Sequence, residues 1–270
     1  MKHYNLIGGG FQHAKCSTLD KIPKTLKWHY ETKQFPETFY VDNGLLAGLH
    51  DINDGKPKYG WILESRIISQ PYINHIKENF QAYKNTYKYI FTHYKELLNL
   101  DPDLFKWTPA YGTYIDDFGI HKKSKLCSMI ASRKTFSSQQ VLRIQVAEAL
   151  DSCNQVDVFG RDTNPIDKKE EGLKDYMFSI AIENDSYETY FTEKIIDCFA
   201  VGTVPVYMGA PDIGNHFNCD GIIKFEPGFD MNILTPELYE SMEDAIRDNY
   251  NRSLKLDILD DWIYNTYINI

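Results

Sequence analysis

Short apolar runs and longer segments with helical spacing alternate along the whole chain. A short apolar run is typical of a buried parallel strand, and apolar residues that recur every three or four positions are typical of an amphipathic helix. The pattern predicts strands at residues 4–7, 59–63, 87–91, 105–109, 126–131, 156–159, 177–182, 204–207 and 222–225. It predicts helices at residues 72–84, 94–100, 138–150, 192–201, 235–250 and 256–267. Such alternation predicts an α/β protein whose parallel sheets are covered by helices.

A polar stretch at residues 111–125 divides this pattern into two series. It contains glycines, the acidic pair Asp116-Asp117 and several lysines, which is the composition of a linker rather than of a packed element. We therefore predict two Rossmann-like domains, residues 1–118 and 119–252, followed by a C-terminal helix within residues 253–270. The cleft between two doubly wound domains is the natural place for a ligand.

The composition is that of a globular protein, and it narrows the choice of partners. The chain has 270 residues, of which 43% are hydrophobic and 25% are charged, the ordinary range for packed domains. Its formal net charge of -9 argues against a protein that grips nucleic-acid backbone over its whole surface. The five cysteines are odd in number and include no Cys-x-x-Cys pair, which predicts free thiols in a reducing compartment. No segment is apolar enough for a signal peptide or a membrane span, so we expect a cytoplasmic protein.

Residues 181–209 combine a buried strand, a polar loop and a helix start that suit an anionic ligand. The strand delivers Glu183 and Asn184 to the loop, and Thr192 is placed to cap the following helix. Backbone N–H groups and the positive end of the helix dipole then face a ligand such as a diphosphate. Lys194 lies in the first helical turn, where a cation opposes the dipole and a bound anion would remove the conflict. The alternative is a solvated ion pair between this lysine and the preceding glutamate.

The order of motifs in this segment resembles the fucosyltransferases of glycosyltransferase family 10. The resemblance rests on Glu183-Asn184, then Tyr190-Phe-Thr-Glu-Lys194, then Gly202-Thr-Val-Pro-Val-Tyr-Met-Gly-Ala-Pro211. Ile182 stands where the family commonly has Phe. Further upstream, the resemblance extends to the strand at 126–132, the helix that carries Arg143, and the segment 156–161. It covers residues 56–225 and is densest after residue 126.

The resemblance implies a GT-B type fold, in which two Rossmann-like domains face a central cleft. The N-terminal domain would bind the acceptor, the C-terminal domain would bind a nucleotide sugar, and the last helix would pack back on the first domain. By family the donor would be GDP-fucose. Arg143 falls on the family's phosphate-binding arginine, and together with Lys194 it would neutralise the diphosphate, so the motifs require no metal ion and no cofactor. Asn184, Tyr190 and Glu193 would shape the nucleoside and sugar pocket.

In the N-terminal half, the strand end Trp61-Ile-Leu-Glu64-Ser65 resembles the segment that carries the family's general base. The resemblance implies an inverting transferase in which Glu64 takes the proton of an acceptor hydroxyl as that oxygen attacks the sugar. Arg66 stands where the family commonly has Pro. A structural glutamate paired with Arg66 or a nearby lysine is the alternative.

The turn Gly8-Gly9-Gly10 follows the first predicted strand and invites comparison with a dinucleotide-binding loop. His13 replaces the third glycine of the Gly-x-Gly-x-x-Gly pattern, so the motif is weak evidence for a dinucleotide. The glycines either allow the close approach of a ligand or form a structural turn. His13 is a candidate contact for the acceptor.

Several other polar residues have simpler explanations than ligand binding. Asp101-Pro102-Asp103 has the spacing of a metal-binding Asp-x-Asp motif, but its proline and its place after a helix favour a turn. The pair Asp260-Asp261 is expected to be solvated. Without the family resemblance, Arg143 could be a surface arginine in a salt bridge, and Arg161 competes with it for the phosphate role.

Four functions remain open from the sequence, three of them close rivals. The first is transfer of fucose from GDP-fucose to an acceptor that we expect to be a glycan. The second is transfer from another nucleotide sugar by the same fold, with a protein or a modified nucleic acid as acceptor. The third is a non-catalytic sugar-binding module, and a nicotinamide oxidoreductase is a more distant alternative. Related transferases keep the fold and the phosphate-binding residues more often than they keep the sugar pocket. The motifs therefore define the phosphate-binding site better than they define the sugar.

Overall fold

The computed structural model describes residues 1–9, 11, 15–18, 21–51, 55–153, 156–160 and 163–269. The described chain forms two compact units. The first unit comprises Met1–Gly112 and Ile258–Ile270, and the second comprises Thr113–Asp257. The boundary after Gly112 lies within the polar stretch predicted to be the linker, and the C-terminal segment belongs to the first unit.

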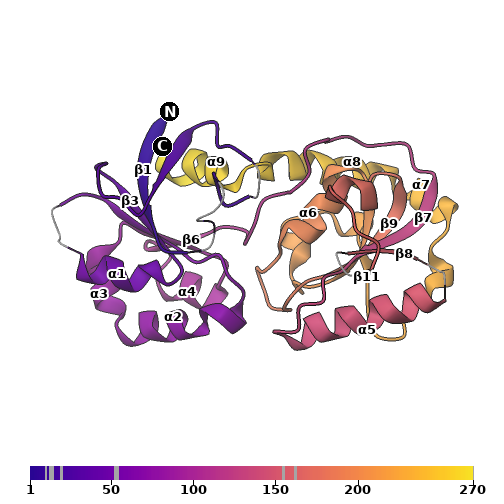
Figure 1. Cartoon of the computed structure of the whole chain (residues 1–270), viewed down its shortest axis with the longest axis horizontal. Coiled ribbons are helices and arrows are strands. Elements are labelled where there is room, and N and C mark those ends of the chain that lie inside the picture. The colour runs from indigo at the N-terminus through magenta and orange to yellow at the C-terminus, as the bar shows by residue number, and fades with distance from the viewer. Residues whose placement is uncertain are drawn as a thin grey trace. The chain divides into compact units, whose positions relative to one another are not determined.

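The first unit contains a six-stranded parallel sheet (Figure 1). In spatial order its strands are β2 (Leu26–Tyr30), β1 (Lys2–Ile7), β3 (Thr38–Val41), β4 (Lys58–Trp61), β5 (Tyr89–Thr92) and β6 (Phe105–Trp107). One face of the sheet is covered by α1 (Gly44–His50), α2 (Arg66–Glu78), α3 (Phe80–Thr86) and α4 (Lys95–Leu100). The other face packs against the C-terminal helix α9 (Leu259–Ile263).

Aromatic side chains dominate the core between this sheet and α9. Successive residues of a strand point to opposite faces of a sheet, so alternate positions share one face. Tyr4, Phe39, Tyr59 and Phe91 contribute to this face from four different strands, and the rings of Phe39 and Tyr59 stack at 4.7 Å. The high tyrosine content of the chain therefore has a structural role in this core, where large rings bury much apolar surface.

The sequence pattern missed β2, β3 and α1. In β2, an edge strand, buried residues alternate with more exposed ones, so it has no continuous apolar run. β3 is fully buried but has only 4 residues. α1 has 7 residues and contains two glycines, Gly44 and Gly48, which are poor helix formers. Tertiary packing therefore decides these three elements.

The glycine turn after β1 allows close packing of the protein's own backbone. Gly8 has a φ of +86°, which favours glycine, and a Cβ atom there would lie 2.5 Å from the carbonyl oxygen of Val41. A Cβ atom on Gly44, at the start of α1, would lie 2.4 Å from the carbonyl oxygen of Ile7. Of the two alternatives for this turn, the described residues support the structural one. His13 lies outside the described residues.

The second unit contains a five-stranded parallel sheet. In spatial order its strands are β11 (Ile223–Lys224), β10 (Val204–Met208), β9 (Tyr176–Ile182), β7 (Lys125–Ile130) and β8 (Asp157–Phe159). Its helices are α5 (Ser138–Ser152), α6 (Glu193–Ala200), α7 (Pro236–Ser241) and α8 (Glu243–Ser253), with a 3₁₀ turn, η1, at Lys169–Gly172. In each unit the first strand lies between the second and the third, which is one of the two common strand orders of doubly wound sheets. The α/β prediction is therefore confirmed.

Two predicted helices are each a pair of shorter helices. The prediction at 72–84 falls on α2 and α3, which meet at Asn79, and the prediction at 235–250 falls on α7 and α8, which meet at Met242. The Asn79 side chain donates a hydrogen bond to the carbonyl oxygen of His75 at 3.0 Å. A side chain that bonds to the backbone in this way competes with the helix and helps to end it.

In the acidic pair of α9, Asp260 is buried and Asp261 is only partly exposed, so the prediction of a solvated pair is wrong for Asp260. Asp260 is 1% exposed and accepts hydrogen bonds from the Ser17 hydroxyl and the Trp28 indole N–H, both at 2.6 Å. Burial raises the pKa of Asp260 to about 6. Asp261 accepts a hydrogen bond from the backbone N–H of Thr25 at 2.8 Å. These contacts join the C-terminal segment to the N-terminal part of the first unit.

All five cysteines are unpaired, as predicted. Within the described ranges, no helix combines the length and the apolar character needed to cross a bilayer.

Candidate functional site

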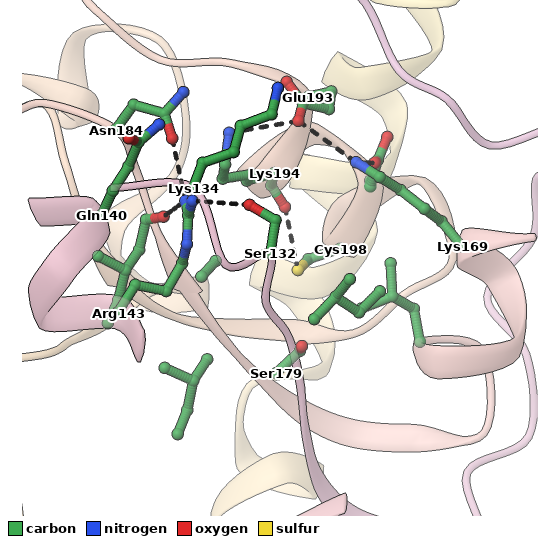
Figure 2. Close-up of a pocket in the computed structure, with 16 residues that line it drawn as sticks. Ser132, Lys134, Gln140, Arg143, Lys169, Ser179, Asn184, Glu193, Lys194 and Cys198 are labelled. Atoms are coloured by element: carbon green, nitrogen blue, oxygen red, sulfur yellow. Dashed lines mark hydrogen bonds and ion pairs between the residues drawn. The ribbon is translucent and has the colours of Figure 1, made fainter. Parts of the chain in front are cut away.

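The second unit has a pocket at the carboxyl ends of β7 and β9 (Figure 2). These two strands are neighbours in the sheet and are the first and third strands of the unit in chain order. This position is the topological switch point, where open α/β sheets bind their ligands. The pocket has a volume of about 210 Å³. Its charged lining residues are the cations Lys134, Arg143, Lys169 and Lys194 and the carboxylates Glu193 and Asp197. The excess of cations favours an anionic ligand.

Arg143 reaches the pocket from α5, whose first turn is fixed by a capping box at Ser137. Arg143 is 3% exposed, and its Nη1 donates hydrogen bonds to the Ile182 carbonyl at 3.1 Å and the Asn184 side-chain oxygen at 3.0 Å. Its Nη2 donates to the Ser132 hydroxyl at 3.3 Å. Burial lowers the pKa of Arg143, because a charge taken out of water is disfavoured.

The arginine has capacity for a further partner. The acceptors just described are all neutral, and Nε is buried without a hydrogen-bond partner among the described residues. The alternative of a surface arginine in a salt bridge is therefore wrong. A buried guanidinium with a spare N–H is suited to bind an anion. The competing Arg161 lies outside the described residues.

Glu183 fixes the start of α6. It follows β9, is 0% exposed, and its carboxylate accepts hydrogen bonds from the Thr192 N–H at 2.9 Å and the Thr192 hydroxyl at 2.7 Å. Nζ of Lys194 lies 3.4 Å from the same carboxylate. Burial raises the pKa of Glu183, although Lys194 opposes the shift. Thr192 also caps α6 by accepting a hydrogen bond from the Lys194 N–H, as predicted.

Glu193 and Lys194 belong to a larger ion network rather than to a solvated pair (Figure 2). Nζ of Lys194 lies 3.2 Å from Oε1 of Glu193, and the two side chains are only 20% and 12% exposed. The same oxygen lies 3.3 Å from Nζ of Lys169, which is also 2.8 Å from Asp197. Burial would raise the pKa of Glu193, but Lys194 and Lys169 outweigh it and hold the pKa well below its ordinary range. Sequence reasoning missed both Lys169 and Asp197.

The predicted donor residues differ in how they meet the pocket. Those that line it are Arg143, Asn184, Glu193 and Lys194. Tyr190 does not line it, because its ring is 1% exposed and stacks on Tyr187 with the ring centres 4.6 Å apart. Any influence of Tyr190 on a ligand in this pocket would therefore pass through its neighbours.

Glu64 lies in the first unit, just beyond the carboxyl end of β4. Its carbonyl oxygen accepts a hydrogen bond from the Tyr94 hydroxyl at 2.6 Å, and its carboxylate lies 3.4 Å from the Tyr111 hydroxyl. Arg66 contacts Glu96 at 3.5 Å, and the described residues provide no ion pair for Glu64. The alternative of a structural pair with Arg66 is therefore not observed. A partly exposed carboxylate at a strand end is suited to accept a proton.

Asp42, which sequence reasoning missed, holds the chain next to Glu64. It follows β3, is 5% exposed, and its Oδ1 accepts hydrogen bonds from the N–H groups of Leu63 at 3.0 Å and Glu64 at 3.4 Å. Its other oxygen is buried without a described partner. Burial raises the pKa of Asp42 to about 7. The signal available in the sequence was the acidic residue directly after the apolar run Phe39–Val41, which was not recognised as a strand.

The Asp101-Pro102-Asp103 motif forms a turn, as predicted. Oδ1 of Asp101 accepts hydrogen bonds from the N–H groups of Asp103 at 3.0 Å and Leu104 at 3.2 Å, and Oδ2 lies 2.7 Å from Nζ of Lys84. Over the part of the chain that the structure describes, no group of three or more His, Cys, Asp or Glu side chains is arranged to hold a metal ion.

Comparison with known proteins identifies the unit that holds the pocket. Residues 120–226 match the family described as glycosyltransferase family 10 (fucosyltransferase), C-terminal. We call this matched segment the family 10 domain. The match confirms the predicted resemblance for residues 120–226 and does not include the strand end at Glu64. The family 10 domain contains the whole switch-point pocket, because the lining residues run from Ile130 to Cys198.

Two sequence relatives carry related names. A putative fucosyltransferase-like protein from Arabidopsis thaliana is 41% identical over 75 residues, which are 26% of this chain and 15% of that protein. An alpha-(1,3)-fucosyltransferase from Helicobacter pylori is 40% identical over 53 residues, which are 20% of this chain and 11% of that protein. The chain thus matches a small part of the length of each relative.

The fold likeness extends beyond the family 10 domain. The chain resembles the crystal structure of an alpha1,3-fucosyltransferase with a TM-score of 0.54, over 93% of this chain and 81% of that chain, at 16% identity. At this identity the likeness concerns the fold alone. It confirms the GT-B class, with its two Rossmann-like units.

Proposed function

We propose that the chain transfers fucose from GDP-fucose to a hydroxyl group of an acceptor, which we take to be a glycan. The observation that carries the proposal is the buried Arg143 at the switch point of the family 10 domain, with neutral partners and a spare N–H. Such a group suits the diphosphate of a nucleotide sugar. Lys194, in the first turn of α6, adds a second cation beside a helix start. The names of the two relatives support fucose as the sugar.

In the proposed reaction, the acceptor oxygen attacks the anomeric carbon of the sugar from the face opposite the diphosphate. The bond between that carbon and the diphosphate oxygen breaks, its electron pair leaves with GDP, and the configuration at the carbon inverts. Glu64 takes the proton of the acceptor hydroxyl. Arg143 and Lys194 stabilise the charge that develops on the departing diphosphate.

The remaining donor residues have supporting roles in this proposal. Asn184 and Glu193 contact the nucleoside or the sugar, since both line the pocket. Tyr190 acts from behind this surface, since its ring is buried against Tyr187. Two cations neutralise the diphosphate, so the proposal requires no metal ion, and full transfer activity in excess EDTA is the expected result.

Isothermal titration with GDP-fucose, GDP and a panel of uridine and adenosine nucleotide sugars tests the donor. We expect the guanosine compounds to bind most tightly. If no guanosine compound binds, the fucosyl assignment is wrong, and binding of another nucleotide sugar would favour the second function. Release of GDP from GDP-fucose needs no acceptor and separates an enzyme from a binding module. Binding without GDP release, even with glycan acceptors present, would favour the non-catalytic alternative.

A further inference from the structure

Lys169 is a cation of the switch-point pocket to which the proposed reaction gives no role. It is the first residue of η1, and its side chain is 26% exposed. Its Nζ contacts two carboxylates of α6, Glu193 at 3.3 Å (Figure 2) and Asp197 at 2.8 Å. The same ammonium lies 4.5 Å from the ring centre of Tyr114, a cation–π contact. Burial would lower the pKa of Lys169, but Asp197 and Glu193 outweigh it, and the side chain stays charged.

Carboxylates on both sides of Lys169 hold residues 113–117, the start of the second unit. Asp197 accepts hydrogen bonds from the Thr113 hydroxyl at 2.7 Å and the Tyr114 N–H at 2.8 Å. Glu170, the next residue in η1, accepts a hydrogen bond from the Asp116 N–H at 2.6 Å. The nearer carboxylate partner of Lys169, Asp197, is therefore itself anchored to Thr113 and Tyr114.

Lys194 also meets two carboxylates, but it lies in the first turn of α6, where the proposed diphosphate would bind. Both of its carboxylate partners, Glu183 and Glu193, lie within 3.4 Å, so an incoming diphosphate must compete with them. When Lys194 turns to the diphosphate, Glu193 would lose a cation in a mostly buried position, which is costly if no other cation remains. Lys169 already contacts the same oxygen of Glu193 and would keep that carboxylate paired.

We propose that Lys169 is a positioning residue of the donor site, which holds Glu193 while Lys194 turns from Glu193 to the diphosphate of the donor. This inference rests on the proposed function, since it requires a nucleotide in the pocket. Lys169 itself makes no contact with the donor. Its effect on donor affinity therefore passes entirely through Glu193.

A double-mutant cycle on GDP affinity tests this dependence. GDP is titrated at fixed ionic strength into the wild type, Lys169→Met, Glu193→Gln and the double variant. Lys169→Met should weaken GDP binding about tenfold in the wild-type background, which is within the usual range for coupled neighbours. In the Glu193→Gln background, where residue 193 no longer needs a cation, the same substitution should change the affinity less than twofold. Lys169→Arg should restore most of the affinity.

Two controls separate positioning from a general effect. Lys168→Met removes the neighbouring lysine, which pairs with Asp116 at the surface, and should leave GDP affinity unchanged. If Lys169→Met does not fold, the cycle is run with Asp197→Asn in every variant, because this change removes the second carboxylate that would be left unpaired.

The outcomes are distinguishable. An equal loss of GDP affinity in both Glu193 backgrounds, with normal binding by the wild type, overturns the inference and leaves the proposed function intact. It would mean that Lys169 either contacts the phosphate directly or supports the fold. Absence of nucleotide binding by the wild type would overturn the proposed function and, with it, this inference. If Lys169→Met weakens GDP binding only in the protein that retains Glu193, the result supports the inference.

Discussion

The two units share one strand order but use the switch point of their sheets differently. In the first unit, Gly8 after β1 packs so closely on Val41 and Gly44 that a side chain would not fit. In the second unit, the equivalent ends of β7 and β9 leave a pocket of about 210 Å³. A doubly wound sheet thus provides a place for a ligand, but the residues that follow its strands decide whether backbone or ligand fills that place.

The charges at the two sheet edges also differ. Asp42 and Glu64 follow two neighbouring strands of the first sheet and place two carboxyl groups at that edge. In the second unit, Arg143, Lys169 and Lys194 gather at the switch point. A carboxylate suits the acceptance of a proton, and a cationic edge suits the binding of a diphosphate. The proposed division of labour between acceptor and donor units follows from this contrast.

Glu64→Gln tests the proposed proton acceptor of the first unit, and it should have the largest effect on activity. The amide keeps the shape of the side chain but cannot take a proton, so we expect kcat to fall about 10²- to 10⁴-fold. GDP affinity should stay within about twofold, because the proposed diphosphate contacts, Arg143 and Lys194, belong to the second unit. Glu78→Gln, an exposed change on α2, is the matched control for both measurements. Retention of transferase activity by the Glu64 variant would show that it is not the base.

Asp42→Asn tests whether the buried Asp42 carboxylate lowers the free energy of unfolding. The folded pKa of about 7 lies above the unfolded value of about 3.9, so between these values the folded state binds the extra proton and this group's contribution to stability falls as pH rises. At roughly 1.4 kcal/mol per pKa unit, the upper bound is about 4 kcal/mol. Asparagine keeps an oxygen for the Leu63 N–H but does not titrate. The free energy of unfolding of the variant, relative to that of the wild type, should therefore rise as the pH is raised from 4 to 8.

Urea unfolding of both proteins at each pH measures this difference. The difference between the two proteins isolates Asp42, because all other titrating groups are shared. A difference that does not change with pH would mean that the Asp42 carboxyl titrates at an ordinary pKa.

Arg143→Gln tests the cationic edge. It removes the buried guanidinium, and we expect GDP to bind about 100-fold more weakly, a loss on the order of 2.7 kcal/mol. Arg143→Lys should recover only part of the affinity, because lysine cannot reproduce the planar fork of donors. Arg247→Gln removes an exposed arginine of the same unit and should leave the titration unchanged. Equal GDP affinity in the wild type and Arg143→Gln would contradict the phosphate role.

The sequence predicted the second unit better than the first for a physical reason. Strands such as β9 and β10 are buried along almost their whole length and read as continuous apolar runs, and the family 10 motifs surround them. In the first unit, β2 and β3 are stabilised by neighbours that are distant in the chain, so their own residues give little signal. The order of the motifs was sufficient to find Arg143 and Lys194.

The missed site residues share one property. Asp42 acts on Leu63 and Glu64, and Lys169 acts on Glu193 and Asp197. These partners are distant in sequence, and a polar residue in a loop gives no sign of which distant group it will meet. Tyr190 is the opposite case, since it lies inside the motif but its ring is buried against a neighbouring tyrosine. A motif identifies a segment, and only packing shows which of its side chains meet the ligand.

Gly8→Ala tests whether backbone packing really closes the first switch point. The new Cβ would lie 2.5 Å from the Val41 carbonyl at a φ of +86°, so the cost combines backbone strain with overpacking, about 2 kcal/mol or more. Gly55→Ala has a similar φ of +77° but nothing within 4 Å of its Cβ, so it should cost only the strain, about 1 kcal/mol. The difference between the two free energies of unfolding measures the packing alone. Equal losses would show that the first switch point has room for a side chain, and GDP affinity in the second unit should be unaffected by either change.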